Sequence, residues 1–363
     1  MRILLVLLLI PAASLGVAWL GGESWMASRA TAVIEARDDL TAHAVDPLRE
    51  PSRIGVHLIE AGYDGLVEGQ PAGLKLPWLD LWVSPTTPYE LRATLPDMVE
   101  LVMNGALIAL QMQGAGASLR FAPSNNMALS RASLQADAIE LGGQSAISAL
   151  SASAKLMGLG HDAPHAAGAA YDIALRLDQA DPAVLAQLGL QPLALPGLLS
   201  ADGGLRLWLD AAPGRGVFQG RAARPQPVGF RSTGLNLTLG DLSAHLLGEI
   251  TADDQGRATG RLALYTKDSQ GWLKAAADAG LIPGSGILLG GAMLKSLSAT
   301  PMQSETVSQT DGHSATARAV SSRADFIFPD PAEGELRLPI FLRDGQIFLG
   351  AIPIGPAPQF PRS

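Results

Sequence analysis

Period-two alternation of apolar and other residues most strongly constrains the fold of this chain. The clearest example is YDIALRLD, in which Tyr171, Ile173, Leu175 and Leu177 are separated by charged or small residues. Successive side chains of a strand point to opposite faces of a sheet, so the pattern predicts a strand buried on one side. Further strands are predicted at residues 74–83, 90–95, 106–112, 117–121, 132–141 and 204–210.

Composition agrees with many strands joined by turns. Of 363 residues, 40 are glycine and 25 are proline. Short helices are expected only at residues 181–189, 270–280 and 286–299, without the regular strand–helix alternation of a parallel sheet. The predicted fold class is mainly β (α+β): an extended, curved, mostly antiparallel sheet with a few packed helices and an N-terminal membrane helix.

Residues 73–83, GLKLPWLDLWV, leave their register open. Leu74, Leu76, Trp78 and Asp80 would share one face of a strand, but the remaining leucines fit no single alternation. The C-terminal third is clearer. It predicts a hairpin of residues 241–250 and 257–267, a polar loop at 301–316, and strands at 319–328, 335–342 and 346–354.

The N-terminus carries a long uncharged segment. Arg2 precedes Ile3–Leu20, which as a helix would span about 27 Å of a bilayer core of about 30 Å. Residues 1–21 are predicted to be a membrane anchor or a signal peptide, and either would export the rest of the chain. Trp19 and Trp25 flank the expected membrane exit and are candidates for the membrane interface.

The remainder is expected to divide into three regions. Residues 22–45 mix alanine with charged residues and predict a helical stalk. Residues 46–212 predict an N-terminal β-rich region, and residues 213–363 a C-terminal β-rich region with a helix pair. The boundary between them is placed where proline, glycine and arginine are frequent, although one continuous body remains an alternative.

Residues with catalytic chemistry form no recognisable motif. The chain has no cysteine, which excludes disulfides, thiolate catalysis and cysteine-ligated metals. His161 and His165 are close in sequence, but Pro164 disfavours the helix that a zinc motif needs, so a surface loop is predicted. The pairs Asp38–Asp39 and Asp253–Asp254 are interpreted as solvated, the second in a turn.

No catalytic, cofactor-binding or metal-ligating residue is therefore assigned, and the protein is predicted not to be an enzyme. A hydrolase would need Asp, His or Ser residues that are distant in sequence to converge in one pocket. The net charge of −8 argues against a nucleic-acid partner.

The last hairpin is apolar on both faces. Ile347 and Leu349 would share one face, and Phe348, Ile352 and Ile354 the other. Such a sheet must be covered on both faces, or it leaves a groove for an apolar ligand. Phe348, Ile352 and Ile354 are the candidate ligand face, with ordinary burial as the alternative.

Three stretches carry a family resemblance. They are residues 223–283 (beginning ARPQPVGFRSTG), residues 336–358 (LRLPIFLRDGQIFLGAIPIGPAP) and residues 195–213 (LPGLLSADGGLRLWLDAAP). With the N-terminal membrane segment, they resemble an uncharacterised family of alphaproteobacterial envelope proteins, domain-of-unknown-function family 2125. The resemblance implies an envelope location and brings no catalytic residue or cofactor. The architecture is also similar in outline to anchored, β-rich, lipid-transfer-like envelope proteins, which is an analogy of fold alone.

These observations predict a protein of the bacterial inner membrane with its body in the periplasm. The leading hypothesis is non-enzymatic binding or guiding of an apolar molecule, such as a lipid, along a sheet face. The alternative is an envelope assembly or scaffold protein that docks another membrane protein. Expected partners are the lipid bilayer, through the N-terminus, and a lipid or another envelope protein. No cofactor is expected.

Overall fold

The computed structural model describes residues 21–67, 70–103, 105–188, 195–218, 221–280 and 326–361, together with Ser298 and Met302. They form two compact units. The first holds residues up to Ala152 and Val184–Gln191, and the second holds Ser153–Ala183 and Pro192–Ser363. The predicted boundary at residues 212–213 lies inside the second unit, because the strands on either side of it pair from Leu199–Leu239 to Leu209–Pro227.

Residues 3–20 and Trp19, which were expected at the membrane, lie outside the described residues. Within the described ranges, the helices are too short or too polar to span a bilayer. The predicted helix at 286–299 and the loop at 301–316 also fall almost entirely outside these ranges.

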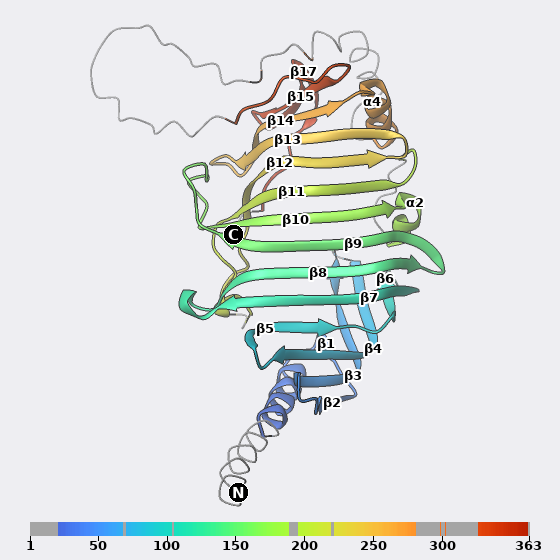
Figure 1. Cartoon of the computed structure of the whole chain (residues 1–363), viewed down its shortest axis with the longest axis vertical. Coiled ribbons are helices and arrows are strands. Elements are labelled where there is room, and N and C mark those ends of the chain that lie inside the picture. Colours follow the sequence, from blue (N-terminus) through green and yellow to red (C-terminus); the bar gives the residue numbers. More distant parts are fainter. Residues whose placement is uncertain are drawn as a thin grey trace, which may run out of the picture. The chain divides into compact units, whose positions relative to one another are not determined.

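The first unit pairs its strands into an antiparallel sheet beside one helix (Figure 1). β3 pairs with β1, β2 and β4; β4 pairs with β5 and β6; both pair with β7, which pairs with β8. The helix comprises residues 21–35. The other elements are β1 (Leu40–Thr41), β2 (Ala44–Pro47), β3 (Ile54–Val67), β4 (Gln70–Ser84), β5 (Thr87–Thr94), β6 (Met98–Met103), β7 (Ala106–Ala122), η1 (Pro123–Asn125), β8 (Ala128–Leu141) and β9 (Gln144–Met157), whose last residues belong to the second unit.

Two sequence predictions in this unit are wrong in extent. The helical stalk ends at residue 35 instead of 45, because Leu40–Thr41 and Ala44–Pro47 form backbone ladders with β3. β7 is one strand where two were expected. The residues between the two predicted strands stay in β7, and its ladder with β8 shifts register between Gln111 and Gly116.

The alternation of β3 and β4 changes phase at one point, which settles the register that the sequence left open. Between the pairs Ile59–Trp78 and Ala61–Leu76, Glu60 has a φ of 49° and falls opposite a proline, which has no N–H to donate. Both halves of each strand therefore direct apolar side chains to the same core: Val56, Leu58, Ala61, Leu74, Leu76, Leu79 and Leu81.

The sequence suggested that Trp78 and Asp80 share a face with Leu74 and Leu76. This prediction is wrong, because the phase change places the two pairs on opposite faces. On the opposite face, the His57 ring stacks on Trp78 with centroids 6.1 Å apart. The Nδ1 atom of His57 also lies 2.6 Å from the Asp80 carboxylate.

A buried carboxylate holds the helix on the sheet. Glu23 is 0% exposed, and its side chain accepts hydrogen bonds from the backbone N–H groups of Arg49 (3.3 Å) and Gly55 (3.4 Å). The Arg49 guanidinium lies 3.9 Å away and balances the charge. Gly55 is required here, since a Cβ atom would lie 2.1 Å from the carbonyl oxygen of Leu81. The first turn of the helix is therefore fixed to the segment that leads into β3.

The second unit is an antiparallel meander in which each strand from β10 to β17 pairs with the next (Figure 1). YDIALRLD lies in β10, as predicted, and the predicted hairpin is β13 and β14. The elements are β10 (Ala169–Ala180), α2 (Pro182–Leu185), η2 (Ala186–Leu188), β11 (Leu199–Leu209), α3 (Arg215–Phe218), β12 (Pro227–Leu239), β13 (Leu242–Ala252), β14 (Ala258–Thr266), α4 (Ser269–Asp278), β15 (Leu336–Arg343), β16 (Gln346–Leu349) and β17 (Ile352–Pro356); the last residues of α2 and all of η2 are counted with the first unit.

Both faces of the C-terminal strands are covered within this unit. On one face, Leu273 of α4 packs with Leu264, Leu338 and Leu349. On the other, Met302, Phe326 and Phe328 pack on Leu247, Ala263 and Tyr265. Residues 326–328, expected at the end of a strand, instead cover the sheet, and the Tyr265 hydroxyl donates to the carbonyl oxygen of Pro329 at 2.7 Å.

The last hairpin differs from its prediction. Asp344 and Gly345 have φ values of 52° and 74° and form the expected corner. The strand predicted at 346–354 is two strands, since Gly350, at φ 61°, reverses the chain.

Leu349 therefore pairs with Ile352 and Phe348 with Pro353, so the supposed common face of Phe348, Ile352 and Ile354 is split. Ile354 packs with Leu349 beside α4, and Phe348 lies under the Arg343 guanidinium, 4.6 Å from its ring centroid.

We expect Glu23→Ala to weaken the attachment of the helix. Two backbone N–H groups would lose their acceptor, which costs about 1–3 kcal/mol at a buried position. Hydrogen–deuterium exchange should show faster exchange in residues 21–35, with a lower midpoint of urea unfolding. Glu35→Ala, at an exposed position of the same helix, is the matched control. Equal exchange in the two variants would contradict the role of Glu23.

Candidate functional site

The first unit has an apolar cavity of about 580 Å³, open to solvent on one side, between the N-terminal helix and the sheet. Its floor is formed by β3 and β4, and the phase change at Glu60 is what places apolar side chains along the whole floor. The cavity is lined by Trp25, Met26, Arg29, Ala30, Val33, Ile34, Leu40, Thr41, Val56, Leu58, Ala61, Gly62, Tyr63, Leu74, Leu76, Leu79, Leu81 and Leu91.

Helical spacing explains how the roof is built. Met26, Ala30 and Ile34 recur every four residues and pack on the core of the sheet. The neighbouring row, Trp25, Arg29 and Val33, has the same spacing and also lines the cavity, but it is exposed. Trp25 is 68% and Val33 49% exposed. The helix therefore presents one row to the floor and one row to the opening.

Polar groups are few and of distinct kinds. Arg29, Thr41, Tyr63 and the indole N–H of Trp25 contribute the hydrophilic side-chain atoms of the lining, and the other side chains are aliphatic, thioether or glycine. Tyr63, on β3, is 44% exposed. Such a surface excludes polar ligands from its interior and can hold a hydrocarbon chain, with polar contacts only at the opening.

Sequence reasoning identified one residue of this cavity, Trp25, for a different reason. Its expected place at a membrane interface stays a prediction. The residues proposed as the ligand face, Phe348, Ile352 and Ile354, belong to the other unit and do not line this cavity. The sequence did contain one signal for the cavity, the two rows of residues spaced four apart within 25–34. The apolar stripe of the helix as a whole is weak, so these rows do not stand out as a face that packs on a sheet.

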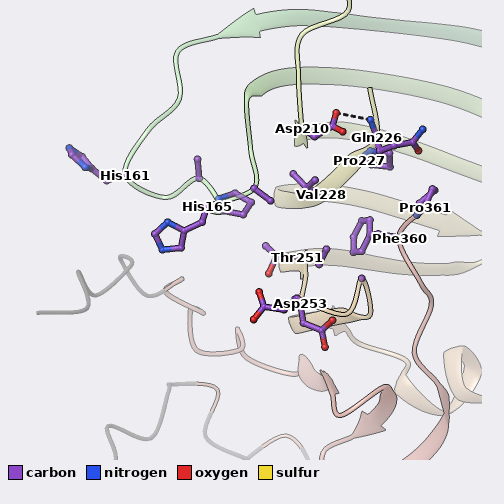
Figure 2. Close-up of a pocket in the computed structure, with 16 residues that line it drawn as sticks. His161, His165, Asp210, Gln226, Pro227, Val228, Thr251, Asp253, Phe360 and Pro361 are labelled. Atoms are coloured by element: carbon purple, nitrogen blue, oxygen red, sulfur yellow. Dashed lines mark hydrogen bonds between the residues drawn. The ribbon is translucent and has the colours of Figure 1, made fainter. Parts of the chain in front are cut away.

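A second, more polar cavity of about 780 Å³ lies in the second unit (Figure 2). Its lining includes His161 and His165, whose segment is a loop as predicted, and Asp210, Thr251 and Asp253. Figure 2 shows His161 apart from the two labelled carboxylates. In the described ranges, no three His, Asp or Glu side chains are grouped to bind a metal ion.

The two labelled carboxylates of this cavity have structural partners. Asp253 accepts from the backbone N–H groups of Gln255 and Arg257, both at 2.8 Å, and holds the turn between β13 and β14. Asp210 accepts from the backbone N–H of Gln226 at 2.8 Å. These contacts explain the two acids as turn and loop stabilisers.

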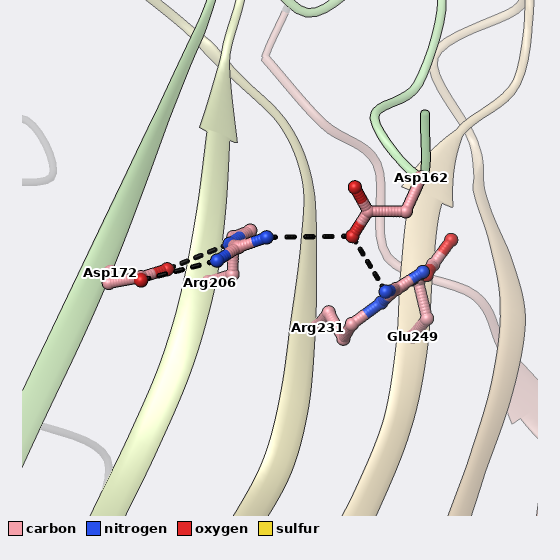
Figure 3. Close-up of polar contacts among 5 residues, drawn as sticks. All are labelled: Asp162, Asp172, Arg206, Arg231 and Glu249. Atoms are coloured by element: carbon pink, nitrogen blue, oxygen red, sulfur yellow. Dashed lines mark hydrogen bonds and ion pairs between the residues drawn. The ribbon is translucent and has the colours of Figure 1, made fainter. Parts of the chain in front are cut away.

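A row of charged side chains crosses four strands of the second unit (Figure 3). Asp172, Arg206, Arg231 and Glu249 are directly opposite one another on β10 to β13. Arg206 donates to Asp172 at 2.7 Å, and these hydrogen bonds raise the pKa of its guanidinium. Asp162, from the loop before β10, lies 2.6 Å from Arg231 and 3.6 Å from Arg206.

This row ties the loop at 158–168 to the sheet. Arg231 is central, since it pairs with both Asp162 and Glu249 and lies 5.6 Å from the ring centroid of the fully buried Trp208. The side chains of Arg231 and Glu249 are only 17% and 15% exposed. Partly desolvated charges of this kind are costly when one partner is removed.

Arg231→Met should therefore destabilise the second unit. It would remove one guanidinium partner from both Asp162 and Glu249. The expected cost is about 2–3 kcal/mol, below the value for fully buried pairs, because water still reaches the site and Arg206 stays 3.6 Å from Asp162. Arg176→Met is the control, because the Arg176–Asp178 pair is exposed and should contribute little. Urea unfolding of the full chain measures both, and equal midpoints would refute a central role for Arg231.

Comparison with known proteins assigns the chain to a family by its sequence. Residues 51–358 match the model of a family described as an uncharacterized protein conserved in bacteria (DUF2125). No curated protein and no solved structure matches the chain. The matched range runs from just before β3 to just after β17 and includes the three stretches that carried the resemblance. The chain belongs to domain-of-unknown-function family 2125.

Proposed function

We propose that the first unit binds the hydrocarbon chain of a lipid in the cavity under its N-terminal helix and that it does so without catalysing a reaction. The observation that carries the proposal is the cavity itself. Its volume of about 580 Å³ lies within the range of about 300–1,000 Å³ typical of small-molecule sites. Its lining is almost free of polar groups, which suits a hydrocarbon chain better than any polar metabolite.

The energetics favour this ligand class. Each methylene group transferred from water to an apolar site contributes about 0.8 kcal/mol. A chain that buries several methylene groups can therefore offset the cost of ordering it, without a single hydrogen bond. The floor is already preformed, because four of its side chains, Val56, Leu58, Ala61 and Leu76, are less than 9% exposed.

The proposed place of action is the periplasmic face of the bacterial inner membrane. The uncharged segment Ile3–Leu20 precedes the roof helix in the sequence, so an anchor there would keep the site close to a source of lipid. The alternative function, docking of another envelope protein, is favoured by the exposure of Trp25 and Val33 at the opening. Lipid binding predicts that affinity increases with the length of a ligand's acyl chain, whereas docking of a protein does not.

A homologous series of uncharged monoacylglycerols, from octanoyl to hexadecanoyl, tests the proposal. We expect the dissociation constant to fall by about fourfold per methylene group, the equivalent of about 0.8 kcal/mol, until the cavity is full and then to level off. Isothermal titration below the micellar concentration, with native mass spectrometry for stoichiometry, gives the measurement. Failure of every member to bind would reject lipid binding in this cavity and favour the docking function.

Filling the cavity should abolish binding. Ala30→Phe places a ring under the roof helix, and we expect at least a tenfold loss of monoacylglycerol affinity because the space for the chain is lost. Ala32→Phe adds the same ring at an exposed position of the same helix and serves as the control. Circular dichroism shows whether each variant is folded. A folded Ala30→Phe protein that binds like the wild type would place the ligand elsewhere.

A further inference from the structure

We propose that the lipid bound in this cavity carries an anionic phosphate headgroup and that Arg29 binds it at the opening. This inference rests on the proposed function and adds to it the chemical class of the ligand. Three observations support it: the position of Arg29, its lack of an acidic partner, and the contrast with neighbouring arginines.

Arg29 is positioned between the apolar interior and water. It lies in the exposed row of the roof helix, one turn from both Trp25 and Val33, and lines the cavity. Among the described lining residues, it alone carries a charge. A chain with its tail among the leucines of the floor would leave its polar end at this opening, within the reach of a long, flexible side chain.

The charge of Arg29 is not used within the described part of the first unit. No described carboxylate forms an ion pair or hydrogen bond with it. The helical positions three and four residues away are occupied by Trp25, Met26, Ala32 and Val33, none of which is acidic. An arginine without an acid, beside an apolar cavity in a chain with a net charge of −8, is available to an external anion.

The other arginines nearby behave differently. Arg37 pairs with Asp39 at 2.5 Å, Arg53 with Glu50 at 3.4 Å, and Arg49 lies 3.9 Å from Glu23. Each of these arginines therefore has an acidic partner. Arg29 differs from them, and it lies at the opening of the cavity, where the polar end of a bound lipid would be.

A guanidinium is also suited to phosphate in particular. It presents paired N–H donors that match two phosphate oxygens, and such charge-assisted hydrogen bonds are about twice as strong as neutral ones. Thr41 and Tyr63 are the lining residues that can add hydroxyl donors to the same ligand. Because Arg29 is exposed, its contribution should be modest and should decrease with salt.

The test compares monoacyl lipids that share one acyl chain and differ in headgroup, measured on the full chain by isothermal titration at low salt. We expect monoacyl phosphatidylglycerol to bind about five- to tenfold more tightly than monoacylglycerol. Arg29→Gln should remove this preference by lowering the affinity for the phospholipid much more than the affinity for monoacylglycerol, and Arg29→Lys should retain part of the preference. Arg37→Gln, a change of the same kind at a paired arginine, should alter neither affinity.

The outcomes separate the two proposals. Equal affinity of the wild type for both lipids, or an equal loss for both in Arg29→Gln, would overturn the headgroup inference while lipid binding stands. A fatty acid of the same chain that binds as tightly as the phospholipid would overturn the assignment to phosphate. If no lipid binds, the proposed function itself fails. A preference that disappears only in Arg29→Gln and declines with salt would support the inference.

Discussion

The change of alternation at Glu60 is the constraint on which the candidate site depends. A strand normally gives every second side chain to one face, so a regular β3–β4 hairpin would direct part of its leucines away from the helix. With Glu60 at a φ of 49° opposite Pro77, both strands shift together, and apolar side chains from both halves reach one core. On the opposite face, between the interruption and the start of β3, His57 contacts Trp78 and Asp80.

The helix above this floor is held at its first turn and is open farther along. Glu23 joins the start of the helix to the segment before β3, while the exposed row of Trp25 and Val33 borders the cavity. The hydrogen bonds to this buried carboxylate add to the packing of Met26 and Ala27 on the sheet and fix the start of the helix.

Strands and turns with a regular local pattern were predictable from the sequence. Interruptions of a strand that involve the neighbouring strand were not. YDIALRLD lies in β10, and the turn at Asp253 joins β13 and β14, because period-two alternation and turn residues act locally. The split of residues 346–354 depends on the conformation of Gly350, and the extent of β7 depends on register shifts against its neighbour. The apolar floor of the cavity depends on the interruption of the β3–β4 register at Glu60 and Pro77, which lie on different strands, and no single segment of the sequence reveals it.

The two units differ in how completely their apolar sheet faces are covered. This difference moves the proposed ligand site from the C-terminal hairpin to the N-terminal helix. Strands that are apolar on both faces must be covered, and in the second unit α4 and the segment around Phe326 and Phe328 cover them. In its charged row each arginine is likewise paired with acids: Arg206 with Asp172, and Arg231 with Asp162 and Glu249. In the described part of the first unit the cover is incomplete, and Arg29, the cationic residue of the cavity lining, has no acidic partner there. Unfilled apolar volume beside unmatched charge is the arrangement that an amphipathic lipid would complete.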